Sequence, residues 1–153
     1  MKTIDFIKNG IILTNLKASS KEEVFQILHD KLYKRGNVKE SFYKGLVERE
    51  KKFPTGILLK SYNIAIPHTD PEHVINPSIA IATLQEPVVF QCMDDENKSV
   101  DVKMVFMLAL NEAHSHIEIL QKIILLIQND LLLENLLKSQ NKEEFVQKIA
   151  QGQ

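Results

Sequence analysis

His68 is the residue of this chain best suited to chemistry. It lies in the segment Ile64-Ala65-Ile66-Pro67-His68-Thr69-Asp70. The first three residues of this segment are apolar and have the composition of a buried strand. Pro67 cannot donate to a sheet ladder and fixes its own φ, so the strand is expected to end there. An imidazole titrates near neutral pH and is a competent nucleophile. His68 is therefore a candidate reaction centre, held at a strand end.

Two more histidines follow the apolar segment 102–110. His116 is expected in the first turn of a helix, where free backbone N–H groups favour anions such as phosphate, and a neutral imidazole can donate to an oxyanion. His114-Ser115-His116 could instead be a metal pair, as in a metal-dependent hydrolase. No further Cys or His completes a plausible ligand set, so no metal is expected.

Arg49 lies between Glu48 and Glu50, on a predicted helix that precedes the strand to His68. Its guanidinium fork suits phosphate, although such a charged run is also typical of a solvated helix face. If the strand ending at His68 runs parallel to 102–110 and beside it, the histidines converge at one sheet edge. The residues by themselves thus predict a possible anion-handling histidine site.

The other chemically capable side chains have simpler interpretations. We expect His29 on a helix surface, His73 in a loop, and Cys92 as a small apolar residue at a strand end with no base to activate it. The acidic segment 94–98 is expected to be a solvated turn, because no regular metal-ligand spacing follows it. No glycine-rich nucleotide loop is present, and no cofactor is expected.

Helices are predicted first and last in the chain, with strands between them. Ser19 and Ser20, each followed by a glutamate three residues later, offer two overlapping capping boxes for a helix that ends near Gly36. Further helices are predicted at about 42–50, 115–128, 131–138 and 142–150, and strands at 62–66, 79–84, 88–90 and 102–110. The predicted core face of the helix after 115 consists of Ile117, Leu120, Ile124 and Ile127.

The segment 102–110 is apolar on both faces from Met104 onward, which suits a strand covered on both sides. We therefore predict one α/β domain, residues 1–153, with a mixed, mostly parallel β-sheet of about five strands between helices on both faces. A net charge of −1 gives no reason to expect nucleic acid or an anionic membrane as partner. The single cysteine excludes an internal disulfide and fits a reducing, cytoplasmic compartment, and no segment is long and apolar enough to span a bilayer.

Three motifs in order carry a resemblance to a known family: Arg49-Glu50-Lys51, then Phe53-Pro54-Thr55-Gly56, then the run from Ile64 to Asp70. Downstream, His116-Ile117-Glu118-Ile119-Leu120 follows the apolar strand in the same way. Together they resemble the enzyme IIA domain of the phosphoenolpyruvate-dependent sugar phosphotransferase system, in its fructose–mannitol superfamily. The resemblance covers nearly the whole chain.

The resemblance implies a phosphocarrier. His68 would be phosphorylated by the phosphocarrier HPr, on Nε2, and would pass the phosphoryl group to a cysteine of a cognate IIB protein. IIB then phosphorylates the sugar entering through the IIC membrane component. His116 would be the second active-site histidine, with His114 as the alternative, and Arg49 matches the active-site arginine; both would stabilise the phosphoryl group. The resemblance leaves the role of Thr55 open.

Mannitol and nitrogen-regulatory members commonly have glycine where this chain has Asn63 and Thr69. The resemblance is closer to the galactitol-type branch, which implies uptake of a galactitol-like polyol. The alternative is a regulatory phosphoacceptor that controls a partner protein by its phosphorylation state. The missing glycines favour transport.

Overall fold

The computed structural model describes residues 3–111 and 113–152, with side chains throughout except at 113–116. Its helices are α1 (Thr3–Lys8), α2 (Lys21–Lys34), α3 (Phe42–Lys52), α4 (Ala113–Ile127), α5 (Asp130–Leu137) and α6 (Lys142–Gln151), with a short 3₁₀ turn, η1, at Pro71–His73. Its strands are β1 (Ile11–Leu16), β2 (Gly56–Ile57), β3 (Asn63–Ala65), β4 (Ser78–Gln91) and β5 (Ser99–Ala109).

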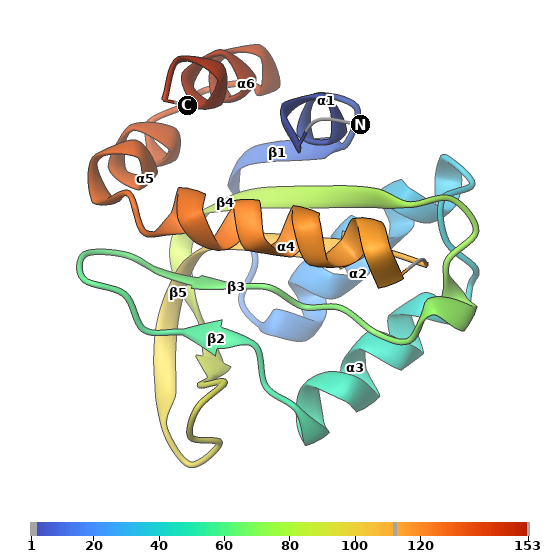
Figure 1. Ribbon diagram of the computed structural model, residues 1–153. Helices are drawn as coiled ribbons and strands as arrows, with labels where there is room; N and C mark the ends of the chain where they lie inside the picture. The colour runs from blue at the N-terminus through green and yellow to red at the C-terminus, as the bar shows by residue number, and fades with distance from the viewer. Residues whose placement is uncertain (1–2, 112, 153) are drawn as a thin grey trace.

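The five strands form one mixed sheet in the order β1-β4-β5-β3-β2 (Figure 1). The β1–β4 and β3–β5 pairs are parallel, whereas the β4–β5 and β2–β3 pairs are antiparallel. The predicted mixed sheet of about five strands between helices is confirmed. We expected mostly parallel strand pairs, but two of the four pairs are antiparallel. One of them is β4–β5, whose strands are joined by a hairpin rather than by a crossover helix.

The sheet is buried on both faces, which explains its continuous apolar strands. In β4, Ile79 and Ile81 face one core while Ala80 and Ala82 face the other. Helices α1, α4, α5 and α6 pack over the isoleucine side, and α2 and α3 pack over the alanine side (Figure 1). The alternation along a single strand therefore gives the protein its three layers.

Side-chain caps start three of the helices. Ser20, Asn129 and Asn141 each accept a hydrogen bond from the backbone N–H three residues later, at 2.8–3.1 Å. Of the predicted capping boxes at α2, the structure shows the cap by the Ser20 side chain, and Gly36 follows the helix with φ of +78°. That left-handed backbone favours glycine and ends the helix where predicted.

The predicted order of elements is wrong at the N-terminus, where α1 and β1 precede the first predicted helix; the two-residue β2 was also missed. The separate strands predicted at 79–84 and 88–90 form one strand, β4. Its register with β5 shifts between Thr83 and Val88, which accommodates Pro87. The Lys103 ammonium donates to the carbonyls of Leu84 and Gln85 at 2.8 and 3.2 Å, so these groups are satisfied at the irregularity.

The predicted core face of α4 is also wrong in part. Ile117 and Ile124 are 60% and 37% exposed, whereas Ile119, Ile123, Leu126 and Ile127 are buried. Apolar residues surround most of this helix, so their spacing did not select one face. The predicted surface position of His29 is also wrong, because the residue is buried. Its ring stacks on those of Tyr33 and Phe42, with ring centroids 5.8 and 6.1 Å apart.

Candidate functional site

His68 lies just beyond the end of β3, beside β5. The two strands are parallel neighbours, with Ala65 opposite Val105. This is the arrangement under which the segments that follow the two strands lie at the same edge of the sheet. After β3 the chain stays attached to β5, because the Leu108 N–H donates to the Pro67 carbonyl at 3.0 Å. Pro67 ends the strand as predicted, and the backbone that carries His68 is fixed on the sheet.

The His68 ring has one defined hydrogen bond. Its Nδ1 lies 2.8 Å from the backbone carbonyl oxygen of Ile66. A carbonyl oxygen only accepts, so Nδ1 carries the proton and Nε2 of the neutral ring keeps a free lone pair. The local backbone therefore selects the tautomer in which Nε2 is the nucleophilic nitrogen.

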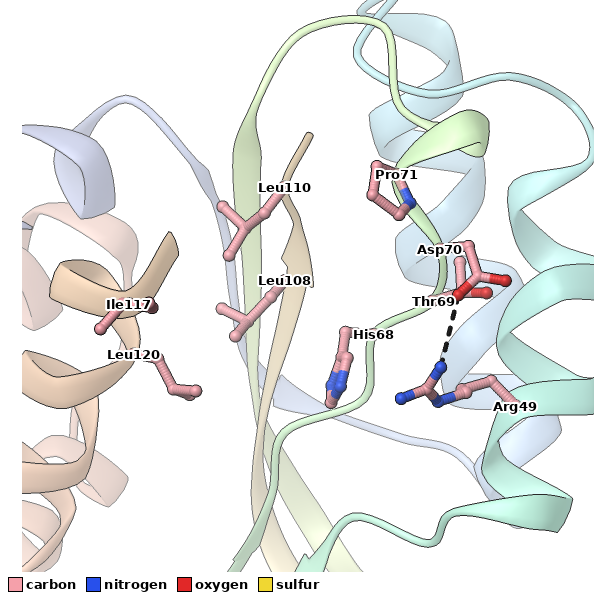
Figure 2. Close-up of a pocket in the computed structure, with 9 residues that line it drawn as sticks. All are labelled: Arg49, His68, Thr69, Asp70, Pro71, Leu108, Leu110, Ile117 and Leu120. Carbon is pink, nitrogen blue, oxygen red and sulfur yellow. Dashed lines mark hydrogen bonds and ion pairs between the residues drawn. The ribbon is translucent and has the colours of Figure 1, made fainter. Parts of the chain in front are cut away.

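His68 lines an open cavity of about 280 Å³ with two chemically different sides. In Figure 2, Arg49 and Asp70 lie to one side of the imidazole, and apolar side chains from the end of β5, from the residue after it and from α4 lie to the other. That apolar side consists of Leu108, Leu110, Ile117 and Leu120. The outward Ile117 is thus explained: it lines the space beside His68 instead of the core.

A second cavity, of about 390 Å³, opens on the α3 side of His68. His68 and Arg49 line both cavities, so the imidazole and the guanidinium form the wall that the cavities share. The second cavity runs along the loop that follows α3 and reaches Met93, Asp94 and Glu96 in the β4–β5 turn. The acidic segment 94–98 is exposed, as the sequence predicted.

Arg49 has unused donor capacity beside His68. Its Nη1 donates to Asp70 Oδ1 at 3.3 Å, a long hydrogen bond to a carboxylate whose side chain is 60% exposed. Its Nε is buried and has no hydrogen-bond partner among the described residues. The guanidinium carbon lies 4.6 Å from the centre of the Phe53 ring, which holds the group in place. Such an arginine suits the recognition of an incoming anion.

Glu50 and Thr55 form a buried pair that sequence reasoning missed. The two carboxylate oxygens of Glu50 accept from the Thr55 N–H and hydroxyl, each at 2.8 Å. Burial raises the pKa of the Glu50 carboxyl, and the hydrogen bonds from Thr55 oppose that shift. The spacing was informative: Glu50 falls four residues after Leu46 and eight after Phe42, on the buried face of α3.

Asn63 and Thr69 each lie against a neighbouring element of the fold. Asn63 accepts from the Leu59 N–H at 3.0 Å and donates to the Asp101 carbonyl at 3.2 Å, which joins the β2–β3 connection to β5. Thr69 faces α3 at Gly45, where an added Cβ would lie 2.9 Å from its hydroxyl. His73 is in η1, and its Nδ1 shares a 2.8 Å hydrogen bond with the Ser41 hydroxyl.

The backbone of His116 belongs to α4, but the side chains of His114 and His116 lie outside the described residues. Within the described part, no cluster of three His, Cys, Asp or Glu side chains could hold a metal ion. Cys92 is buried and 1% exposed, as expected of a small apolar residue.

The chain is similar along nearly its whole length to proteins of one family. A family described as "Phosphoenolpyruvate-dependent sugar phosphotransferase system, EIIA 2" matches residues 5–152. The galactitol-specific EIIA component of Escherichia coli K12 is 29% identical over 143 residues, which are 92% of this chain and 91% of that protein. The fructose-specific EIIABC component of Bacillus subtilis is 27% identical over 99% of this chain and 23% of its own length.

The fold is similar to that of the mannitol enzyme IIA of Escherichia coli, solved in complex with phosphorylated enzyme IIB. The TM-score is 0.73 at 22% identity, covering 92% of this chain and 94% of that one. No helix among residues 3–111 and 113–152 is long and apolar enough to cross a membrane. The chain belongs to the EIIA type 2 family of the phosphoenolpyruvate-dependent sugar phosphotransferase system.

Proposed function

We propose that this protein carries a phosphoryl group on Nε2 of His68, accepts it from HPr and passes it to a cysteine of a IIB protein during uptake of a galactitol-like polyol. The observation that carries the proposal is the 2.8 Å hydrogen bond from His68 Nδ1 to the Ile66 carbonyl. It leaves Nε2 with a lone pair, and Arg49 lines the same cavities as the ring.

Each transfer exchanges one bond to phosphorus for another. On arrival, the Nε2 lone pair of His68 forms an N–P bond while the N–P bond to the HPr histidine breaks, and the electron pair stays on the donor imidazole. On departure, the IIB cysteine thiolate forms an S–P bond and the electron pair of the broken N–P bond returns to Nε2. Such transfers need positioning and charge stabilisation rather than covalent help from the protein.

Arg49 is proposed to stabilise the charge on the phosphoryl oxygens. Its buried Nε has no partner among the described residues, and its long bond to Asp70 can be exchanged for a shorter one to phosphate. His116 is proposed as the second stabilising group. Its neighbour Ile117 lines the cavity beside His68, which supports a place for this turn of α4 near the phosphoryl group.

The proposed partners follow from the family and from the relatives. The mannitol enzyme IIA was solved with phosphorylated enzyme IIB, and IIC would be reached only through IIB. The same proposal places the protein in the cytoplasm with HPr. The galactitol-specific relative, at 29% identity, supports the polyol branch of substrates.

Transfer from the phosphorylated protein to IIB tests this proposal. The protein is labelled with radioactive phosphoenolpyruvate, enzyme I and HPr, separated from them, and mixed with the galactitol IIB of the related system. We expect the label to move to the IIB cysteine, and a IIB with serine at that cysteine to receive none. Label that stays on His68 with every polyol, fructose and mannitol IIB, but changes binding to a regulatory protein, would favour the regulatory alternative.

A further inference from the structure

A line of hydrogen bonds connects a buried carboxylate to His68. It begins at Glu50, which is 3% exposed and accepts twice from Thr55 at 2.8 Å. The Thr55 carbonyl then accepts from the Ile66 N–H at 3.2 Å. The Ile66 carbonyl in turn accepts from His68 Nδ1 at 2.8 Å. Each of these residues is thus hydrogen-bonded to the next, from Glu50 through Thr55 and Ile66 to His68.

The middle of this line is held tightly. Thr55 is 2% exposed, and Ile66 is 3% exposed. The Ile66 peptide is therefore held through its N–H by Thr55, while the following Pro67 carbonyl is held by Leu108 at 3.0 Å. A movement of the Thr55 backbone would shift or rotate the carbonyl that orients the imidazole, because the Thr55 carbonyl accepts from the N–H of Ile66.

Burying a carboxylate to hold a threonine costs free energy, so stability alone does not explain Glu50. Burial penalises the charged form of Glu50, as the raised pKa of its carboxyl indicates. The carboxylate nevertheless provides two acceptors on adjacent oxygens that match the N–H and hydroxyl of one residue. It also follows Arg49 on α3, so one helical turn carries both a phosphate-binding group and the start of the line to His68.

We propose that Glu50 is a positioning residue for phosphoryl transfer. Glu50 fixes Thr55, Thr55 fixes the Ile66 peptide, and the Ile66 carbonyl holds His68 in the Nδ1–H tautomer with Nε2 directed toward the phosphoryl donor. Glu50 itself touches neither the phosphoryl group nor the imidazole. The inference rests on the proposed role of His68, and it adds the residues that prepare His68 for that role.

Four variants of the full chain separate the links. Glu50→Ala removes both acceptors, and Thr55→Val removes the hydroxyl donor while keeping the shape of the side chain. Glu50→Gln and Thr55→Ser are the matched conservative variants. A glutamine can accept from the Thr55 N–H through its carbonyl and donate to the Thr55 hydroxyl through its amide, so it preserves both contacts without the charge.

Two measurements are made on the folded fraction of each variant. Nitrogen-15 NMR of the His68 ring reports which nitrogen is protonated, and single-turnover kinetics report the rate of phosphorylation by phospho-HPr. We expect Glu50→Ala and Thr55→Val to mix the two tautomers and to slow phosphorylation roughly 10- to 100-fold, the range caused by small misplacements of a reacting group. Glu50→Gln and Thr55→Ser should keep the wild-type tautomer and recover most of the rate.

An unchanged His68 tautomer and an unchanged rate per folded molecule in both Glu50→Ala and Thr55→Val would overturn the inference. A Glu50→Gln variant as slow as Glu50→Ala, with the wild-type tautomer, would also overturn it, because the charge rather than the hydrogen bonds would then matter. If Glu50→Ala does not fold, the inference is tested by comparing the His68 tautomer and the phosphorylation rate of Thr55→Val with those of Thr55→Ser. Failure of the proposed function looks different: wild-type protein would take no phosphoryl group on His68, whereas the tautomer readings would still test the line of hydrogen bonds.

Discussion

The Nδ1 atom of His68 lies 2.8 Å from the carbonyl oxygen of Ile66, so the strand that delivers the imidazole also sets its tautomer. The two residues are separated only by Pro67, whose fixed φ limits how the chain can turn between them. A strand, a proline and a histidine together therefore prepare a nucleophilic nitrogen. Arg49 lies on one side of the ring and an apolar wall on the other.

Replacement of Arg49 tests the stabilisation of the phosphoryl group. Arg49→Ala should lower the rate of phosphorylation by phospho-HPr roughly 100-fold, the usual effect of removing one donor aimed at developing charge. Arg49→Lys should recover only part of the rate, because an ammonium lacks the planar fork. Stopped-flow transfer assays measure both. Wild-type rates in Arg49→Ala would remove Arg49 from the site.

The open choice between two histidines gives a matched pair of variants. His116→Ala should slow transfer from the phosphorylated protein to IIB, since a hydrogen-bond donor to the phosphoryl oxygens is lost. His114→Ala should leave that transfer unchanged. Urea denaturation is the control, and His116→Ala should reduce the transfer rate more than it reduces the free energy of unfolding. If His114→Ala is the slow variant, the assignment of the second histidine is reversed.

Gly56→Ala tests the packing of the loop that carries Thr55. An added Cβ would lie 2.5 Å from the Gln91 carbonyl oxygen, a backbone atom that cannot move aside easily. The expected loss of unfolding free energy is about 1–3 kcal/mol, measured by urea denaturation.

Gly36→Asn is the control for Gly56→Ala. At Gly36 nothing lies within 4 Å of an added Cβ, and asparagine tolerates a φ of +78° better than other residues. Its loss should be the smaller of the two. A Gly56→Ala protein as stable as wild type would show that the β2 edge can open without cost.

The buried imidazole of His29 makes stability depend on pH. Burial lowers the pKa of His29 from its ordinary value of 6.5, while the carboxylates of Asp30 and Glu40 oppose the shift. The unfolded chain therefore binds a proton at a pH where the folded protein does not. The stability that neutral His29 contributes is fully present above pH 6.5, and it is lost as the pH falls from there through the lower pKa of the folded state. Wild type should lose more unfolding free energy than His29→Leu between about pH 7.5 and about pH 5.

Each protein is compared with itself at the two pH values, so a change in packing caused by the substitution, which does not depend on pH, cancels from the loss of unfolding free energy. Equal losses in wild type and His29→Leu would show that His29 titrates normally in the folded protein. The same result would contradict the burial of its ring against Tyr33 and Phe42.

The sequence was most informative where chemistry and local backbone coincide. The end of β3 before Pro67 and the Ser20 cap of α2 could be expected from residue types and spacing. The parallel pairing of β3 with β5 was a condition of the predicted site, and the structure meets it. The core face of α4 could not, because apolar residues surround that helix and only packing on the sheet selects among them. Likewise β1 has no strict alternation: Asn15 interrupts it with a φ of +55°.

The site itself was only partly accessible from the sequence. His68 and Arg49 were found as residue types in a motif, and the structure brings both to the same two cavities. The burial of Glu50 was hidden, since a charged residue next to Arg49 and Lys51 is usually solvated. Only the fold shows that this carboxylate points inward at Thr55.

The central claim is that Nε2 of His68 carries the phosphoryl group. Its most direct test is NMR of nitrogen-15-labelled protein after incubation with phosphoenolpyruvate, enzyme I and HPr. We predict a phosphorus-coupled nitrogen at Nε2 of His68, one acid-labile phosphoryl group per chain, and no label in His68→Ala. Label that persists in His68→Ala, or a phosphorus coupling on another histidine, would contradict the account.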